Sequence, residues 1–286
     1  MILVTGAGGK TGRSLIGALS KFESVCALVR RGEQVAPARG LGAEKVIIGD
    51  MRDESVIRSA VQGVRGVYHI CPNMNPEEAV IGGLVIDAAR ASSVEHFVYH
   101  SVLHPQAERM GHHWQKLRVE EMILESGLPF TILQPAPYMQ NLLAGWKSIV
   151  EDGILRVPYS VSSKFSFVDL EDVAEVATVV LTEPIHLNAI YELAGTTPTP
   201  YVQVAEVFSD ILKRNVRAEK EEIADWRRRT KGLTDYAAEN LVAMFEYYNK
   251  WGLKGNPNVL RQLLRREPAS LESFIQRYVS GQSDEK

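Results

Sequence analysis

The feature that most constrains this chain is a set of three glycines, Gly6, Gly9 and Gly12, that directly follows the apolar run Met1-Ile2-Leu3-Val4. So short an apolar run predicts a strand buried in a parallel sheet, and residues 14–19 resume at helical spacing. Glycines in a strand-to-helix turn let backbone N–H groups approach a pyrophosphate at the helix N-terminus. The spacing is G-x-x-G-x-x-G rather than the commoner G-x-G-x-x-G, and a tight turn needs glycines even without a ligand. The sequence therefore predicts a dinucleotide site, with a purely structural turn as the alternative.

Strand and helix patterns alternate through the first half of the chain. Apolar strand-like runs are expected at 24–29, 45–48, 66–70, 96–100 and 129–133, and helices at about 53–62, 77–92 and 112–126. This alternation predicts an α/β fold with a doubly wound parallel sheet. Gly82-Gly83 within one predicted helix indicates close helix packing.

The rhythm changes after Gln134-Pro135. Helices are expected at 203–214, at 221–250 and from about Ser270, with strands only at about 165–168 and 190–193. We expect a dinucleotide-binding domain over 1–135, with returning elements from about 165–195, and a smaller, helix-rich substrate part over 136–286 that caps the carboxyl ends of the sheet. The polar tail from Ser280 to Lys286 is expected to fray.

Composition and charge exclude several classes of function. The formal net charge of −3 gives no electrostatic reason to expect nucleic acid, and the apolar runs are too short to cross a membrane. With the first strand predicted from residue 1, a cytoplasmic protein is expected. Cys26 and Cys71 lie in strand-like runs without metal-ligand spacing, so buried free thiols and no metal site are expected.

Arg30 and Asp50 follow the second and third predicted strands. A carboxylate at the tip of the second strand would bind the ribose of NAD, whereas an arginine there favours the 2′-phosphate of NADP. We therefore favour NADP(H) over NAD(H), the alternative being that Arg30 and Arg31 are solvated loop residues. Asp50 is expected either to reach the adenine or to cap the helix that begins near Asp53.

The segment from His112 to Lys116 lies near the start of a predicted helix, with these two residues on one helix face. Lys116 is placed to bind the nicotinamide ribose and to bring positive charge near the reacting carbon. His112 or His113 could donate a proton to reduced substrate, because an imidazole titrates near neutral pH. The alternative is that the two histidines are exposed and idle.

Aromatic and basic residues of the second half suggest a substrate wall and a solvated surface. Tyr138, Asn141 and Trp146 suit a flat, conjugated ligand, or else they pack the joint between the sheet and the second part. The basic run 226–231 and the group Arg261, Arg265 and Arg266 are typical of solvated helix faces.

Taken together, these segments resemble the NmrA-like branch of the atypical short-chain dehydrogenases/reductases. The matching segments are 4–12, Arg30, Gly49-Asp50, 100–104, 116–121, 134–141 and 167–174. The resemblance implies an NAD(P)-binding Rossmann domain with a small C-terminal substrate part. It implies that the pyrophosphate is contacted by Gly6, Gly9, Lys10, Thr11 and Gly12. It also implies that Arg30 contacts the adenosine phosphate and that Asp50 and Met51 contact the adenine. Pro72 and Ser101 would then lie beside the cofactor at the ends of strands four and five, and Pro135 and Tyr138 would lie by the nicotinamide.

One departure from the wider superfamily bears on the reaction. Lys116 fills the lysine position of the Tyr-x-x-x-Lys pair, but His112 stands where the tyrosine would be. The resemblance then implies an NADP(H)-dependent oxidoreductase that passes a hydride to a small planar or conjugated acceptor of the quinone, enone or carbonyl type, with Lys116, His112, His113 and Tyr138 as candidate catalytic residues. The alternatives are a dinucleotide-sensing regulator that binds a protein partner and a non-redox enzyme on the same scaffold. A homodimer or a protein partner is a further expectation.

Overall fold

The computed structural model describes residues 1–283, which divide into two compact units. The first unit comprises 1–134 and 173–191, and the second comprises 135–172 and the described residues from 192 to 283.

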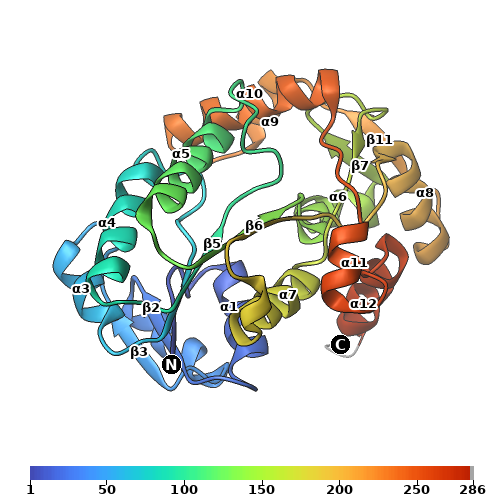
Figure 1. The fold of residues 1–286 in the computed structure, drawn as a ribbon. Helices are drawn as coiled ribbons and strands as arrows, with labels where there is room; N and C mark the ends of the chain where they lie inside the picture. Colours follow the sequence, from blue (N-terminus) through green and yellow to red (C-terminus); the bar gives the residue numbers. More distant parts are fainter. Residues whose placement is uncertain (284–286) are drawn as a thin grey trace. The chain divides into compact units, whose positions relative to one another are not determined.

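A seven-stranded sheet forms the centre of the first unit, in the order β3-β2-β1-β4-β5-β6-β9 (Figure 1). All the neighbouring pairs from β3 to β6 are parallel. The strands are β1 (Ile2–Val4), β2 (Val25–Val29), β3 (Lys45–Ile48), β4 (Gly66–His69), β5 (His96–His100), β6 (Phe130–Pro135) and β9 (Ala189–Leu193). Strands β1, β2, β4 and β5 are buried along their whole length, which explains why the sequence shows continuous apolar runs there instead of alternation. The doubly wound α/β fold is confirmed.

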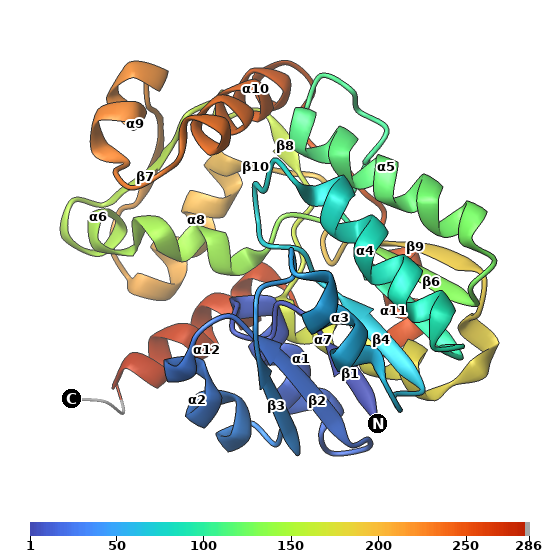
Figure 2. The same cartoon turned by 90° about the vertical axis from the view of Figure 1, so that its left-hand side faces the viewer.

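Helices cover both faces of this sheet. They are α1 (Lys10–Leu19), α2 (Val35–Gly40), α3 (Glu54–Val61), α4 (Glu78–Ala91), α5 (Gly111–Ser126) and α7 (Leu170–Thr182), with short 3₁₀ turns η1 (Gly32–Gln34) and η3 (Pro184–His186). Helices α3, α4 and α5 lie on one face, and α1 and α7 on the other (Figure 2). A buried apolar core that includes Leu3, Val85 and Phe97 fills the space beneath α3, α4 and α5.

Helices α4 and α5 pack closely because α4 carries a glycine at their contact. A Cβ atom on Gly82 would lie 2.8 Å from both methyl carbons of Val119 on α5. The prediction that Gly82-Gly83 reports close helix packing is therefore confirmed for Gly82. Cys26 and Cys71 are buried and unbridged, as predicted.

The second unit contains more strands than the sequence suggested. Its elements are η2 (Met139–Gly145), α6 (Trp146–Glu151), β7 (Ile154–Val157), β8 (Lys164–Phe165), β10 (Thr199–Pro200), α8 (Tyr201–Leu212), β11 (Arg217–Lys220), α9 (Ile223–Arg229), α10 (Asp235–Trp251), α11 (Asn258–Leu264) and α12 (Leu271–Ser283). Strands β7 and β11 pair in parallel, and β8 and β10 pair antiparallel. The prediction of a helix over 221–250 is wrong between α9 and α10, and β7 and β11 were not predicted. Helix α12 runs to Ser283, and the rest of the tail expected to fray, residues 284–286, lies outside the described residues.

Aromatic rings form the core of the second unit. The ring of Phe165 lies 5.0 to 5.3 Å from those of Tyr159, Tyr201 and Tyr248, measured between centroids. Such tilted and edge-on pairs add specific geometry to the burial of large apolar area. In the described part of the chain, none of the helices combines the length and apolar character needed to span a membrane.

Candidate cofactor and active site

Most predicted site residues of the first unit lie at the carboxyl ends of adjacent strands. Gly6 follows β1, Arg30 follows β2, Asp50 follows β3, Pro72 follows β4 and Ser101 follows β5. Because these strands are parallel neighbours, their carboxyl ends meet at one edge of the sheet. Open α/β sheets bind ligands at this edge, beside the point where the strand order reverses, which here is between β1 and β4.

The glycine turn after β1 is closely fitted to the backbone around it. Gly6 has a φ of +58°, and a Cβ there would lie 2.7 Å from the carbonyl oxygen of Ile70. A Cβ on Gly12 would lie 2.6 Å from Cα of Ala7 and 2.6 Å from the carbonyl oxygen of Gly6. Gly12 therefore lets α1 pack directly on the turn, while Gly6 supplies a backbone conformation that other residues rarely adopt.

The outer side of the same turn is open and suited to an anion. A Cβ on Gly9 would meet only the Gly6 carbonyl oxygen, at 3.3 Å, and both Gly9 and Lys10 are exposed. Helix α1 starts after Gly9 with no side-chain cap and with no acidic residue in its first turn. Unpaired N–H groups and the helix dipole favour a phosphate at such an end, so the turn fits the pyrophosphate of a dinucleotide.

Arg30 is exposed beside a network of charges at the ends of β2 and β3. Its Nε lies 3.9 Å from Oδ2 of Asp50, and 72% of its side chain is exposed. Arg52 binds the same carboxylate more closely, with Nη2 at 2.6 Å and Nε at 3.1 Å. Hydrogen bonds from Arg52 lower the pKa of Asp50 to about 2, so this carboxylate is ionised. Asp53 rather than Asp50 caps α3, so the capping alternative for Asp50 is wrong.

Gln34 fixes the turn that carries Arg30. Its Oε1 accepts hydrogen bonds of 3.0 Å from the backbone N–H groups of Arg30 and Arg31. The amide end of Gln34 occupies the space that a Cβ on Gly8 would fill. The loop after β2 is thereby attached to the glycine turn, which explains why Gly8 is a glycine although it lies outside the regular spacing.

Ser101 and Met51 are held by the protein itself. Ser101 Oγ donates a hydrogen bond to Oε1 of the buried Glu120, which also accepts from Gln134 Nε2 at 3.0 Å. Burial raises the pKa of Glu120. The side chain of Met51 packs against the apolar core, and Pro72 is exposed.

Lys116 is buried and forms an ion pair with a carboxylate that sequence reasoning missed. Its Nζ lies 3.0 Å from Oε1 of Glu78 and donates to the backbone carbonyl oxygen of His100 at 3.2 Å. Only 6% of Lys116 is exposed, and Glu78 is fully buried. The ammonium group has three N–H donors, and the carboxylate and the carbonyl use two of them.

His112 and His113 are both buried, so the alternative that they are exposed is wrong. Burial, assisted by the charge of Lys116, lowers the pKa of His112 to about 3 and that of His113 to about 4. The imidazole of His113 donates from Nδ1 to the carbonyl oxygen of His104, because a carbonyl can only accept. Both rings are therefore neutral near neutral pH.

Five buried histidines in the first unit have a lowered pKa. Burial is the main cause in each, and the pKa falls to about 4 for His69, His96 and His113 and to about 3 for His100 and His112. Three of them are hydrogen-bonded to neighbouring hydroxyl groups: His100 to Tyr68 at 2.7 Å, His96 to Thr131 at 2.8 Å and His69 to Thr5 at 2.9 Å. Buried, hydrogen-bonded imidazoles of this kind serve the packing of the sheet as neutral polar groups.

The remaining predicted site residues, Pro135, Tyr138, Asn141 and Trp146, belong to the second unit. Tyr138 precedes η2 and forms a strand-like bridge with Val168, Asn141 is exposed, and Pro135 is buried. The ring of Trp146 packs edge-on against Tyr278, at 4.9 Å between centroids.

Two buried aspartates and two arginines brace the second unit. Asp169 accepts a hydrogen bond of 2.7 Å from Gln140 and forms an ion pair with Arg277. Asp172 is paired with Arg266 at 2.7 Å. Arg266 is an exposed surface residue, as predicted, and it also binds a buried carboxylate.

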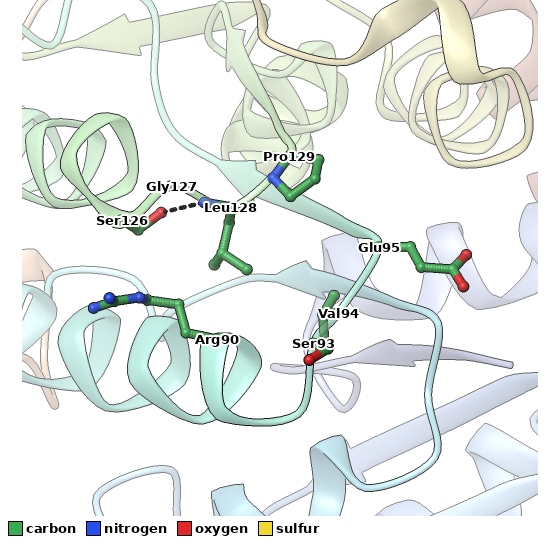
Figure 3. A pocket seen from close by; sticks show the side chains of 8 residues that line it. All are labelled: Arg90, Ser93, Val94, Glu95, Ser126, Gly127, Leu128 and Pro129. Carbon is green, nitrogen blue, oxygen red and sulfur yellow. Dashed lines mark hydrogen bonds between the residues drawn. The ribbon is translucent and has the colours of Figure 1, made fainter.

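The shallow hollow in Figure 3 lies away from the glycine turn. It has a volume of about 410 Å³ and is bordered by the C-terminal ends of α4 and α5, with Arg90 and Ser126 among its lining residues. Glu95 and Pro129, which also line it, directly precede β5 and β6. It therefore opens at the amino ends of the strands, opposite to the edge where α/β sheets bind ligands.

The residues of the site that were not predicted differ in how clearly the sequence pattern indicated them. Glu78 shares a helix face with Ile81, Val85 and Ala89, all buried, so helical spacing alone would have placed a charged residue on the buried side of α4. Gln34 and Glu120 have no such signal, because their roles depend on contacts with other elements.

The sheet order, the glycine turn and the residues at the strand ends define a dinucleotide-binding α/β protein of the Rossmann type. The chain belongs to the NmrA-like family, whose model matches residues 1–276. This confirms the predicted family.

Named relatives and solved structures agree with this assignment. The chain is 28% identical to quinone oxidoreductase 2 of Escherichia coli over 279 residues, covering 96% of this chain and 97% of that protein. It is 32% identical to an NAD(P)H azoreductase of Xenophilus azovorans, covering 76% of each chain. The crystal structure of the Escherichia coli NADPH-dependent quinone oxidoreductase complexed with NADPH has a TM-score of 0.86 and 27% identity, covering 98% of this chain and 100% of that one.

Proposed function

We propose that this protein is an NADPH-dependent reductase that transfers a hydride to a quinone or a similar conjugated acceptor. The enzyme class follows the named relatives, which confirm the prediction of an NAD(P)H-dependent reductase of the NmrA-like type. The preference for NADPH and for a conjugated acceptor is more specific than this class, and residues of the first unit support it.

Arg30 supports the preference for NADPH. Asp50 is bound mainly by Arg52, which leaves the exposed Arg30 guanidinium available to a phosphate at the end of β2. A guanidinium pairs with a phosphate through two parallel hydrogen bonds, which a ribose hydroxyl cannot reproduce.

The burial of His112 and His113, which keeps both rings neutral, is the observation on which the proposed acceptor class rests. When bound, the reduced nicotinamide supplies a hydride, and the acceptor must then carry the negative charge or take up a proton. A histidine whose pKa is about 3 or about 4 holds no extra proton to donate at neutral pH. The hydroxyl of Ser101 already donates a hydrogen bond to Glu120. This arrangement favours acceptors that delocalise the charge themselves, such as quinones, over simple ketones and aldehydes.

The role proposed for Lys116 is to bind and orient. The ammonium N–H of Lys116 that is not bound to Glu78 or to the carbonyl of His100 is available to the nicotinamide ribose. Holding the nicotinamide close to the acceptor then supplies much of the rate. Tyr138, Asn141 and Trp146 remain proposed contacts of the acceptor.

The test is NADPH oxidation, followed by absorbance, with a benzoquinone, a naphthoquinone, an enone, an aldehyde and a ketone. We expect turnover with the quinones, formation of the hydroquinone in equal amount, and little or no rate with the ketone. The variant that tests the proposed cofactor contact is Lys116→Met, which keeps most of the side-chain length but removes the N–H donors and should therefore weaken NADPH binding. Tight NADPH binding without oxidation of any acceptor would refute the proposal and favour the dinucleotide-sensing regulator.

A further inference from the structure

Glu78 is a buried carboxylate close to the proposed site, in the first turn of α4. Its accessible surface is zero, which is rare for a glutamate unless it is paired. Its Oε1 accepts hydrogen bonds from Lys116 Nζ at 3.0 Å and from the hydroxyl of Tyr99 at 2.8 Å. The carboxylate therefore joins α4 to both α5 and β5.

The contacts of Lys116 make its charge and position dependent on Glu78. Its Nζ has one charged partner, Glu78, and one neutral partner, the carbonyl oxygen of His100. The ammonium also lies 5.2 Å from the centre of the Tyr99 ring. An ammonium group with only a carbonyl and a ring as neighbours, at 6% exposure, would lose its proton more readily.

The electrostatics of Glu78 agree with a charged pair. Burial raises the pKa of Glu78, but the charge and hydrogen bond of Lys116 together with the hydrogen bond of Tyr99 outweigh this effect, and the pKa is lowered overall. The surrounding titratable groups are His69, Cys71, Tyr99, His100, His112, His113 and Glu120. The histidines are neutral at neutral pH, and burial raises the pKa of the Cys71 thiol and of the Tyr99 hydroxyl. Glu120 is the other carboxyl of the group, and burial raises its pKa too.

We propose that Glu78 is the positioning residue of the site, which holds Lys116 charged and aims its remaining N–H at the bound NADPH without contacting the cofactor itself. This inference rests on the proposed function, because it takes Lys116 as a contact of the cofactor. It differs from a purely structural role of Glu78 in one respect: the state of Lys116 should change with pH when Glu78 loses its charge.

The experiment measures the dissociation constant of NADPH by calorimetry between about pH 6 and about pH 9 for wild type and Glu78→Gln, with thermal unfolding of each to verify the fold. We expect wild-type affinity to change little over this range. In Glu78→Gln the affinity should be about tenfold weaker at neutral pH and should weaken further as the pH rises, because the unpaired ammonium loses its proton.

Two further variants separate positioning from structure. Lys116→Met sets the affinity without the ammonium, and adding Glu78→Gln to it should cause no further loss, because coupled residues are not additive. Tyr99→Phe removes a hydrogen bond to the same oxygen but leaves the ion pair, so its affinity should show no new pH dependence. If Glu78→Gln does not fold, Glu78→Asp replaces it, and a charged partner should keep the binding independent of pH.

The outcomes distinguish this inference from the proposed function. Wild-type affinity and wild-type pH dependence in Glu78→Gln, additive losses in the double variant, or a new pH dependence in Glu78→Asp would each overturn the role of Glu78. A wild-type protein that binds no NADPH would instead overturn the proposed function and leave the ion pair as a structural feature. A wild-type protein that binds NADPH without reducing any quinone would overturn the proposed function alone, because the affinity measurements would still decide the role of Glu78.

Discussion

Replacing two glycines of the same helix should have opposite effects on stability. Gly12 and Gly17 both lie in α1, so alanine gains the same helix propensity at each, about 1 kcal/mol. A Cβ on Gly17 would meet its nearest neighbour, a methyl carbon of Leu41, at 3.7 Å, which is an ordinary contact. A Cβ on Gly12 would lie 2.6 Å from backbone atoms of Ala7 and Gly6, which cannot rotate away.

These distances set the expected magnitudes. Overpacking costs about 1–3 kcal/mol, and a clash with backbone belongs at the upper end, about 3 kcal/mol. After the gain in propensity, Gly12→Ala should lower the free energy of unfolding by about 2 kcal/mol, whereas Gly17→Ala should raise it by up to about 1 kcal/mol. For a domain of about this size, each kcal/mol shifts Tm by about 2–4 °C.

The assay is thermal unfolding of the two variants and wild type, together with calorimetric binding of NADPH. Gly12→Ala should melt about 4–8 °C below wild type, and its affinity for NADPH should fall at least tenfold because the clash displaces the glycine turn. Gly17→Ala should melt at or above the wild-type temperature with unchanged affinity. A Gly12→Ala variant as stable as Gly17→Ala would refute the reasoning, because the helix would then not be packed directly on the turn.

Three further predictions concern the cofactor, acid stability and the proton donor. Arg30→Ala should weaken the binding of NADPH about 10- to 100-fold and leave the binding of NADH unchanged in calorimetric titrations, because it removes a charge-assisted hydrogen bond to the phosphate. Arg58→Ala on α3 is the control, and equal losses of affinity for both cofactors would contradict the role assigned to Arg30. The five buried histidines have a folded pKa of about 3 or about 4, below the value of about 6.5 in the unfolded chain, so the stability they contribute is complete above about pH 6.5. It is lost as the pH falls towards about 4 for three of them and about 3 for the other two, by up to about 1.4 kcal/mol per pH unit for each histidine. Urea unfolding at several pH values should show this loss, and a flat profile would be incompatible with neutral buried imidazoles. The kcat of quinone reduction, measured from about pH 6 to about pH 8, should show no titration step near pH 6.5 that depends on His112. A step that is present in wild type and absent in His112→Asn would identify His112 as an acid in the reaction.

The first half of the fold could be predicted because its strands are buried on both faces. The predicted run 96–100 coincides with β5, and the predictions for β2, β3 and β4 differ from the observed bounds by one residue or none. A parallel sheet covered by helices leaves this continuous apolar signal in each strand.

The second half gave no comparable signal. Strand β11 is Arg217–Lys220, a polar segment that is exposed at both ends, and it pairs with β7 far earlier in the chain. No local pattern specifies such a pairing, because contacts made only in the folded state stabilise it. The break between α9 and α10 was missed for a related reason: helical spacing on both sides concealed the turn around Gly232, which has a φ of +83°.

Within the site, sequence reasoning found residue types and strand ends but not the partners of each side chain. The glycines, Arg30 and Lys116 were predicted because their chemistry is recognisable at those positions. The burial of His112 and the pairing of Glu78 with Lys116 depend on how α4 and α5 pack, which the chain specifies only through contacts such as Gly82 against Val119.

The partner of Lys116 connects the missing tyrosine to the choice of acceptor. A tyrosine beside a lysine ammonium is acidified by the positive charge, and it can then protonate a simple carbonyl. Here the ammonium charge is balanced by Glu78 at 3.0 Å, and the neighbouring ring at the tyrosine position is a neutral imidazole. In the proposed reaction, the Lys116–Glu78 pair would therefore bring little net positive charge to stabilise an alkoxide, and the histidines would hold no extra proton to neutralise one. A quinone needs neither, because its reduced form spreads the charge over the ring and takes its protons from water.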